Sequence, residues 1–194
     1  MNVTLPLWLV VSQWTLLFAL AALVFVVYRQ IGYLLDLRDL GTEREGLPIG
    51  EEAPAFDYTP VNQHISVSTR FEPKGGWSLL LFADPGCVSC QNVLPVLETL
   101  APKVERPLRS LVVTSAEPVQ IAASDAFMTT SLDIARASYD VSSRLYRTRV
   151  TPFAYLIDAE GKIRAKGIAT DESAMRKIVY GVERTIIKVG ATTS

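Results

Sequence analysis

Two cysteines one helical turn apart, at the junction of a predicted strand and a predicted helix, constrain this chain more than any other feature. The apolar run Trp77–Phe82 has the length of a buried strand. Asp84, Pro85 and Gly86 form a turn, and apolar residues then recur at helical spacing over 89–101. A strand–turn–helix unit with Cys87 and Cys90 at the start of its helix is therefore predicted.

This position favours redox chemistry at the cysteine pair. Cys87 falls at the first helical turn, where unpaired N–H groups and the positive end of the helix dipole favour thiolate over thiol. Cys90 lies one turn later on the same face, so it can attack a mixed disulfide formed at Cys87. Two alternatives stay open at this point. One is half of a zinc site, which needs two more ligands in a chain with no other cysteine and a single histidine, His64. The other is a pair of unreactive core cysteines.

Several motifs around the cysteines resemble the thioredoxin superfamily. A proline follows the pair in Cys87-x-x-Cys90-x4-Pro95, and Val150-Thr151-Pro152-Phe153 resembles the family's cis-proline loop. The segment Gly50-x-x-Ala53-Pro54-x-Phe56 is similar to the opening of its membrane-anchored redoxin and TlpA-like branch. Within that branch, the chain resembles the thioredoxin-like accessory proteins of methylamine utilisation (MauD).

The resemblance implies an α/β, thioredoxin-like fold, with a mixed central sheet flanked by helices. It assigns Cys87 as nucleophile and Cys90 as resolving thiol. Thr151 and Pro152 would form the wall that binds substrate, with Val88 and Ser89 beside it. No cofactor is expected, because the Cys87–Cys90 disulfide itself would carry the electrons.

Three residues near the pair carry open questions. Leu81 stands where thioredoxin has a buried aspartate that helps deprotonate the resolving thiol. Asp84 is the nearest carboxylate, and it is either a proton acceptor acting through water or simply a turn residue. Ser89 either donates a hydrogen bond to the Cys87 thiolate or caps the helix backbone.

The N-terminal sequence predicts a membrane anchor. Residues 5–28 contain no charged residue and are long enough to cross a bilayer as a helix, with Trp8 and Tyr28 near its ends. A cleaved signal peptide is the alternative, but no basic segment precedes the apolar run. Residues 29–50 are interpreted as a juxtamembrane helix and linker, and residues 51–190 as the thioredoxin-like domain.

Two arguments about membrane orientation disagree. Arg29, Arg38 and Arg44 follow the apolar run and no basic residue precedes it, so the positive-inside rule places the domain in the cytoplasm. The resemblance, and the lack of any cysteine beyond the pair, favour an extracytoplasmic domain. The expectation is a single-pass protein of the cell membrane with an extracytoplasmic domain.

The remaining elements follow from residue patterns. Strands are expected at 56–59, 65–67, 108–114, 153–157 and 162–166, and helices at 118–128 and 141–146. Asp140 and Asp171 are the expected N-caps of the helix at 141–146 and of a last helix, whose inner face carries Ala174, Ile178, Val182 and Ile186.

The function expected from the sequence is that of a membrane-anchored thiol–disulfide oxidoreductase acting on client proteins. The resemblance suggests a disulfide-rich client such as methylamine dehydrogenase, or a cytochrome c apoprotein, together with a membrane redox partner. A peroxiredoxin-like peroxidase is an alternative, although Leu80 and Asp84 stand where that site needs a proline and a hydroxyl residue. A non-enzymatic metal chaperone or scaffold is another. The net charge of −1 and the lack of a basic run exclude a nucleic-acid partner.

Overall fold

The computed structural model describes residues 7–61, 68–104 and 106–180. The chain divides into two compact units, residues 1–42 and 43–194. Each unit is described by itself.

The first unit is formed by helix α1 (Leu7–Arg44). The helix runs on without a break past residue 28, where the sequence predicted a boundary between an anchor and a separate juxtamembrane helix. Within residues 11–27 large apolar side chains such as Trp14, Phe18 and Phe25 are exposed. Among the residues that the structure describes, no helix is both long enough and apolar enough to cross a membrane, so the transmembrane helix predicted over 5–28 is not supported.

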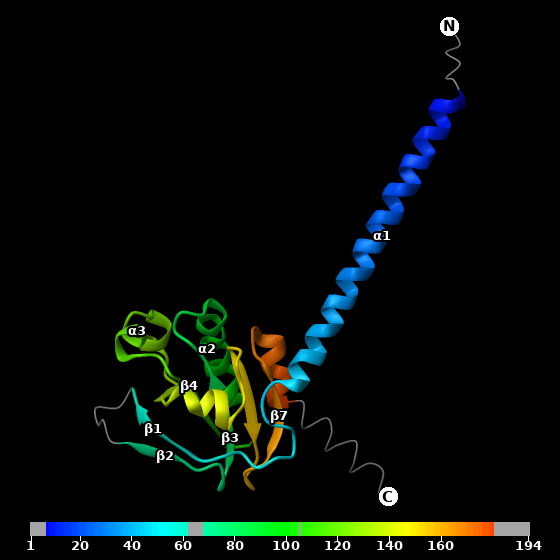
Figure 1. Cartoon of the computed structure of the whole chain (residues 1–194). Helices are drawn as coiled ribbons and strands as arrows, with labels where there is room; N and C mark the ends of the chain where they lie inside the picture. The colour runs from blue at the N-terminus through cyan, green and yellow to red at the C-terminus, as the bar shows by residue number, and fades with distance from the viewer. Residues whose placement is uncertain (1–6, 62–67, 105, 181–194) are drawn as a thin grey trace, which may run out of the picture. The chain divides into compact units, whose positions relative to one another are not determined.

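The second unit is built on one seven-stranded sheet with the order β2-β1-β5-β4-β3-β6-β7 (Figure 1). The three central strands β3, β4 and β5 are parallel, whereas β6, β7, β1 and β2 are each antiparallel to a neighbour. The mixed sheet expected from the resemblance is thereby confirmed. The strands are β1 (Phe56–Pro60), β2 (Thr69–Phe71), β3 (Trp77–Phe82), β4 (Leu108–Thr114), β5 (Asp133–Arg136), β6 (Phe153–Ile157) and β7 (Ile163–Ile168).

Strand β3 is buried on both faces, which explains its uninterrupted apolar sequence. Side chains alternate along the strand, so Leu79 and Leu81 enter one core, and Leu80 and Phe82 enter the other. Strand β6 repeats this division, with Leu156 in the first core and Tyr155 in the second. The end of β3 is thus packed on both faces, so the turn that leads to the cysteines starts from a rigid strand.

The first core is covered by helices. Helix α2 (Val88–Leu100) contributes its buried face, which consists of Cys90, Val93, Leu94, Leu97 and Leu100. Two short helices, α3 (Pro118–Ala122) and α4 (Asp125–Thr129), stand where one helix over 118–128 was predicted. They are separate because the Ala123–Ser124 junction ends the first, and Ser124 begins the second in an extended conformation.

Two further helices were predicted close to where they occur. A π-helical turn η2 (Val141–Leu145) occupies the predicted helix at 141–146, but Asp140 makes no side-chain capping hydrogen bond there. The last helix covers residues 172–180 of the described chain, and the Asp171 carboxylate accepts the Ala174 N–H at 2.9 Å as the predicted cap. Val182, Ile186 and the predicted strand at 65–67 lie outside the described residues.

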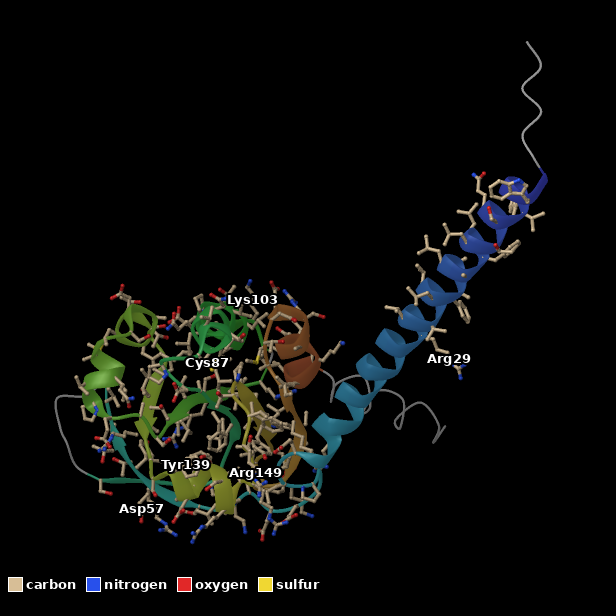
Figure 2. The ribbon with its side chains drawn as sticks, turned by 45° about the horizontal axis from the view of Figure 1, so that its top comes forward. Arg29, Asp57, Cys87, Lys103, Tyr139 and Arg149 are labelled. Carbon is tan, nitrogen blue, oxygen red and sulfur yellow. The ribbon has the colours of Figure 1, made fainter. Side chains whose placement is uncertain are left out.

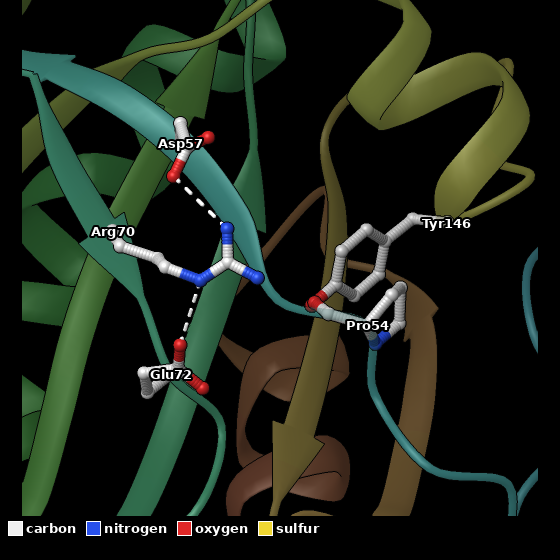
Figure 3. A network of polar contacts seen from close by, with 5 residues as sticks. All are labelled: Pro54, Asp57, Arg70, Glu72 and Tyr146. Carbon is white, nitrogen blue, oxygen red and sulfur yellow. Dashed lines mark hydrogen bonds and ion pairs between the residues drawn. The ribbon is translucent and has the colours of Figure 1, made fainter.

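The second core is closed by the segment that precedes the sheet. The Tyr155 hydroxyl donates to the Tyr146 carbonyl at 2.7 Å and accepts the Leu47 N–H at 3.0 Å. The Tyr146 hydroxyl donates to the Pro54 carbonyl at 2.7 Å (Figure 3). Burial raises the pKa of both tyrosines, so both hydroxyls stay protonated as donors.

Candidate active site

A tight turn places Cys87 at the start of α2. The Asp84 carbonyl accepts the Cys87 N–H at 3.0 Å, and its carboxylate accepts the Gly86 N–H at 2.8 Å. From the helix, the Gln91 side chain donates to the Pro85 carbonyl at 2.6 Å. The turn residue predicted at position 84 therefore has a defined role, which is to fold the chain back towards the helix.

The Cys87 sulfur is the N-cap of α2. It accepts the Cys90 backbone N–H at 3.2 Å, in the position where serine or aspartate oxygens commonly cap helices. The cap predicted as an alternative role for Ser89 thus belongs to Cys87. The sulfur is half-buried, and the N–H that it accepts is one of the first-turn donors that have no partner within the helix.

Cys90 is the buried partner. Its side chain has no exposed surface, and it interacts with the side chains of both Cys87 and Thr151. Burial raises the pKa of the Cys90 thiol to about 12, although a hydrogen bond with the Asp84 backbone partly offsets this effect. Leu81, which stands in place of thioredoxin's aspartate, is fully buried in the same core. At neutral pH Cys90 is therefore a thiol.

The loop before β6 forms one wall of the site. The Thr151–Pro152 peptide bond is cis, as the resemblance implied. The Cys87 sulfur lies 3.8 Å from the Thr151 carbonyl oxygen. Pro152 is buried and its carbonyl accepts the Ala169 N–H at 3.0 Å, whereas Thr151 is exposed. The fold thus brings together Cys87, Cys90, Thr151 and Pro152, although Cys87 and Thr151 are 64 residues apart in sequence.

The two residues between the cysteines differ in exposure. Val88 is 69% exposed and offers an apolar surface next to Cys87, whereas Ser89 is half-buried in the first turn of α2. Both lie beside the cysteine pair, where the resemblance placed substrate contacts.

A cavity of about 220 Å³, here called the side pocket, adjoins this wall. It shares Asp84 and Thr151 with the cysteine site, and Tyr139 and Arg149 also line it. Figure 2 labels Cys87, Tyr139 and Arg149 in the same unit. This pocket was not predicted from the sequence, because its lining comes from the ends of β3 and β4, from the segment that runs from β5 into η2, and from the loop before β6. The available signal was the run Arg144, Arg147 and Arg149 just ahead of the Thr-Pro pair.

In the described part of the chain, no group of three or more histidine, cysteine or acidic side chains is close enough together to hold an ion.

The chain is similar in sequence to known proteins. The chain is 31% identical to the methylamine utilization protein MauD of Methylobacillus flagellatus over 164 residues, covering 81% of this chain and 77% of that protein. It is also 31% identical to MauD of Methylophilus methylotrophus, with 81% and 75% covered. No protein-family model matches.

Solved structures share the fold. A candidate thiol:disulfide interchange protein DsbE from Chlorobium tepidum superposes with a TM-score of 0.59 at 18% identity, covering 70% of this chain and 98% of that one. The thioredoxin domain of a thiol-disulfide oxidoreductase from Bacteroides vulgatus gives 0.52 at 21% identity, with 69% and 99% covered. The second unit therefore has a thioredoxin-like fold.

Proposed function

The chain belongs to the family of the methylamine utilization protein MauD, and from this premise we propose that it exchanges disulfides with client proteins through Cys87 and Cys90. The observation that carries the proposal is the contrast within the pair. A half-buried sulfur caps a helix beside a cis-proline loop, and a fully buried thiol lies one turn behind it. One sulfur is placed to meet a client, and the other only to meet the first sulfur.

The exchange takes two steps, in which two electrons pass to the client. The Cys87 thiolate attacks one sulfur of the client disulfide, which forms a Cys87–client disulfide and releases the other client sulfur as thiolate. Cys90 then loses its proton and attacks the Cys87 sulfur, which forms the Cys87–Cys90 disulfide and releases the second client thiolate. The same steps in reverse oxidise a client dithiol. The reduction potentials of the two pairs set the direction.

Asp84 is the proton acceptor that we propose for the second step. It is exposed and lies in the turn whose backbone contacts Cys90, so a water molecule could carry the proton between them. No buried carboxylate is available at position 81 to do so.

A reduction assay on the full chain in detergent tests this function. With dithiothreitol as electron donor, the protein is expected to accelerate the reduction of a model disulfide protein such as insulin. Cys87→Ala should abolish the acceleration, while a matched change at an exposed apolar residue far from the pair, Val119→Ala, should not. Equal activity of the Cys87→Ala variant and the unchanged protein would overturn the proposal.

The client that we propose is a disulfide-rich protein of methylamine utilisation, such as methylamine dehydrogenase, with a cytochrome c apoprotein as second choice. Support comes from the name of the relatives, which assigns them to methylamine utilisation. Deleting the gene in a host that grows on methylamine should then leave that enzyme's cysteines as thiols. Full oxidation of those cysteines without the gene would exclude this client.

We also propose that the N-terminal helix attaches the domain to the cell membrane on its extracytoplasmic side, next to a membrane redox partner. The support is the uncharged sequence over residues 5–28 and the exposed apolar side chains within it. The chain should stay with membranes through an alkaline carbonate wash, and an impermeant maleimide should label Cys87 in intact spheroplasts. Release by the wash would overturn attachment, and labelling only after lysis would reverse the orientation.

A further inference from the structure

The side pocket shares two residues with the surroundings of Cys87, although Cys87 itself does not line it. Its lining includes Thr151, whose carbonyl oxygen is 3.8 Å from the Cys87 sulfur. It also includes Asp84, whose carbonyl accepts the Cys87 N–H. A client cysteine bonded to Cys87 would therefore bring its neighbouring side chains close to two residues of this lining.

Arg149 is the cation of the pocket. Its side chain is exposed, and none of the ion pairs within the described residues includes it. Arg147, two residues earlier, is exposed as well. It has a left-handed backbone (φ 53°) and lies in the chain between η2 and Arg149. Arg144 differs, because it pairs with Asp140 at 3.3 Å and does not line the pocket.

The one acidic group of the lining is already engaged. One oxygen of the Asp84 carboxylate accepts the Gly86 N–H, and Asp84 forms no ion pair with Arg149 in the described structure. Two hydroxyls of the lining are engaged as donors, Ser142 to the Tyr139 carbonyl and Thr148 to the Val150 carbonyl. The one cationic group of the lining is the guanidinium of Arg149, which suits a carboxylate.

We propose that the side pocket selects clients with an acidic side chain next to the target cysteine, and that Arg149 is the residue that recognises it. This inference rests on the proposed function, since it names a class of client for the same cysteine pair. The pocket volume of about 220 Å³ accommodates one side chain of this size, not a folded element. Because Arg149 is exposed, its preference should weaken with added salt.

Short peptides with one cysteine, held as a mixed disulfide with 2-thiopyridine, provide the test. The residues on both sides of the cysteine are Glu in one peptide, Gln in the second and Lys in the third. The reduced full chain attacks the peptide sulfur and releases thiopyridone, whose absorbance gives the second-order rate constant. We expect the Glu peptide to react about tenfold faster than the Lys peptide at low salt, and about twofold faster at high salt.

The matched variants are Arg149→Gln and Arg144→Gln, which remove the same charge inside and outside the pocket. Arg149→Gln should bring the Glu-to-Lys rate ratio close to one, while Arg144→Gln should keep most of it. An equal loss of preference in both variants, or a wild-type preference for the Lys peptide, would overturn the role of Arg149 while leaving the exchange reaction intact. Failure of the wild-type protein to react with any peptide would overturn the proposed function itself.

Discussion

At the scale of single residues, the chemistry depends on the difference between two thiols three residues apart. Cys87 caps a helix and reaches the surface, whereas Cys90 is enclosed by apolar side chains of the first core. Because burial disfavours a charged sulfur, the environment of Cys90 raises its pKa to about 12. In the proposed exchange, Cys87 is therefore the member of the pair that meets the client first.

This difference predicts how alkylation of Cys90 depends on pH. In a Cys87→Ala variant, the reaction of Cys90 with iodoacetamide should still be accelerating at pH 10, where an ordinary thiol with a pKa of about 8.5 is almost fully ionised. As the control, the same variant unfolded in guanidinium chloride should give a pH midpoint of alkylation near the ordinary thiol pKa. A folded-state midpoint at or below 8.5 would show that burial does not govern this thiol.

A second prediction concerns Asp84, which has both a turn role and a proposed chemical role. Asp84→Asn keeps an oxygen that can accept the Gly86 N–H, so the free energy of unfolding should change little. If the carboxylate accepts the proton, Asp84→Asn should resolve a Cys87–peptide disulfide about tenfold more slowly. Rapid mixing with acid quench measures this rate. Asp84→Ala should in addition lower the free energy of unfolding by about 1 kcal/mol. Unchanged resolution in Asp84→Asn would leave Asp84 with the turn role only.

At the scale of elements, the segment before β1 is fixed to the sheet by the buried tyrosines. Gly46 has a φ of +73°, and a Cβ at this position would lie 1.9 Å from the Tyr155 hydroxyl oxygen. Gly50 has a similar φ of +92° but open space around it. A comparison of substitutions at the two glycines therefore separates the effect of backbone strain from that of steric overlap with Tyr155.

Alanine substitution at both glycines tests this attachment. Gly50→Ala should lower the free energy of unfolding by about 1 kcal/mol, from backbone strain alone. Gly46→Ala should lower it by about 3 kcal/mol, because Tyr155 must also move and lose its hydrogen bonds. Chemical denaturation measures both values, and equal losses would show that the tyrosine contact does not hold the segment.

The hairpin of β6 and β7 contains a buried carboxylate that predicts a pH effect. Burial alone would raise the pKa of Asp158, but the Lys162 N–H and the Arg164 guanidinium outweigh it and hold the pKa below its ordinary value. A lowered folded-state pKa contributes stability above the unfolded value, and this stability is lost as the pH falls through the folded value. The free energy of unfolding should therefore drop more steeply below pH 4 in the unchanged protein than in Asp158→Asn. Parallel curves for both proteins would contradict this assignment.

At the scale of the whole molecule, much of the second unit could be predicted from its sequence. Strands β3 and β6 are continuous apolar runs, because they are buried on both faces, and such runs are easily recognised. Strand β5 was missed, because its four residues begin with Asp133 and end with Arg136 and only the two between them are buried. Its pairing with β4 and β1 comes from the tertiary fold, which no local pattern shows.

The candidate site, too, could be predicted from the sequence only in part. The cysteine pair and the proline loop each have a local signature, and the resemblance connected them. The side pocket has no such signature, because four separate segments of the chain build it and only the fold brings Tyr139 and Arg149 near Thr151. Residues 5–28 have a strong apolar sequence pattern. Of this segment, the described structure shows a helix with exposed apolar side chains.

The most direct test of the central claim is to trap the mixed disulfide. A Cys90→Ala variant expressed in the native host should accumulate a covalent complex with its client, since the second step is blocked. Cys87→Ala should accumulate none, because the remaining thiol is buried. Non-reducing gels and mass spectrometry of the purified complex would identify both the bonded cysteine and the client. A client disulfide at Cys87 in the first variant alone is the predicted result, and equal trapping by both variants would contradict the account.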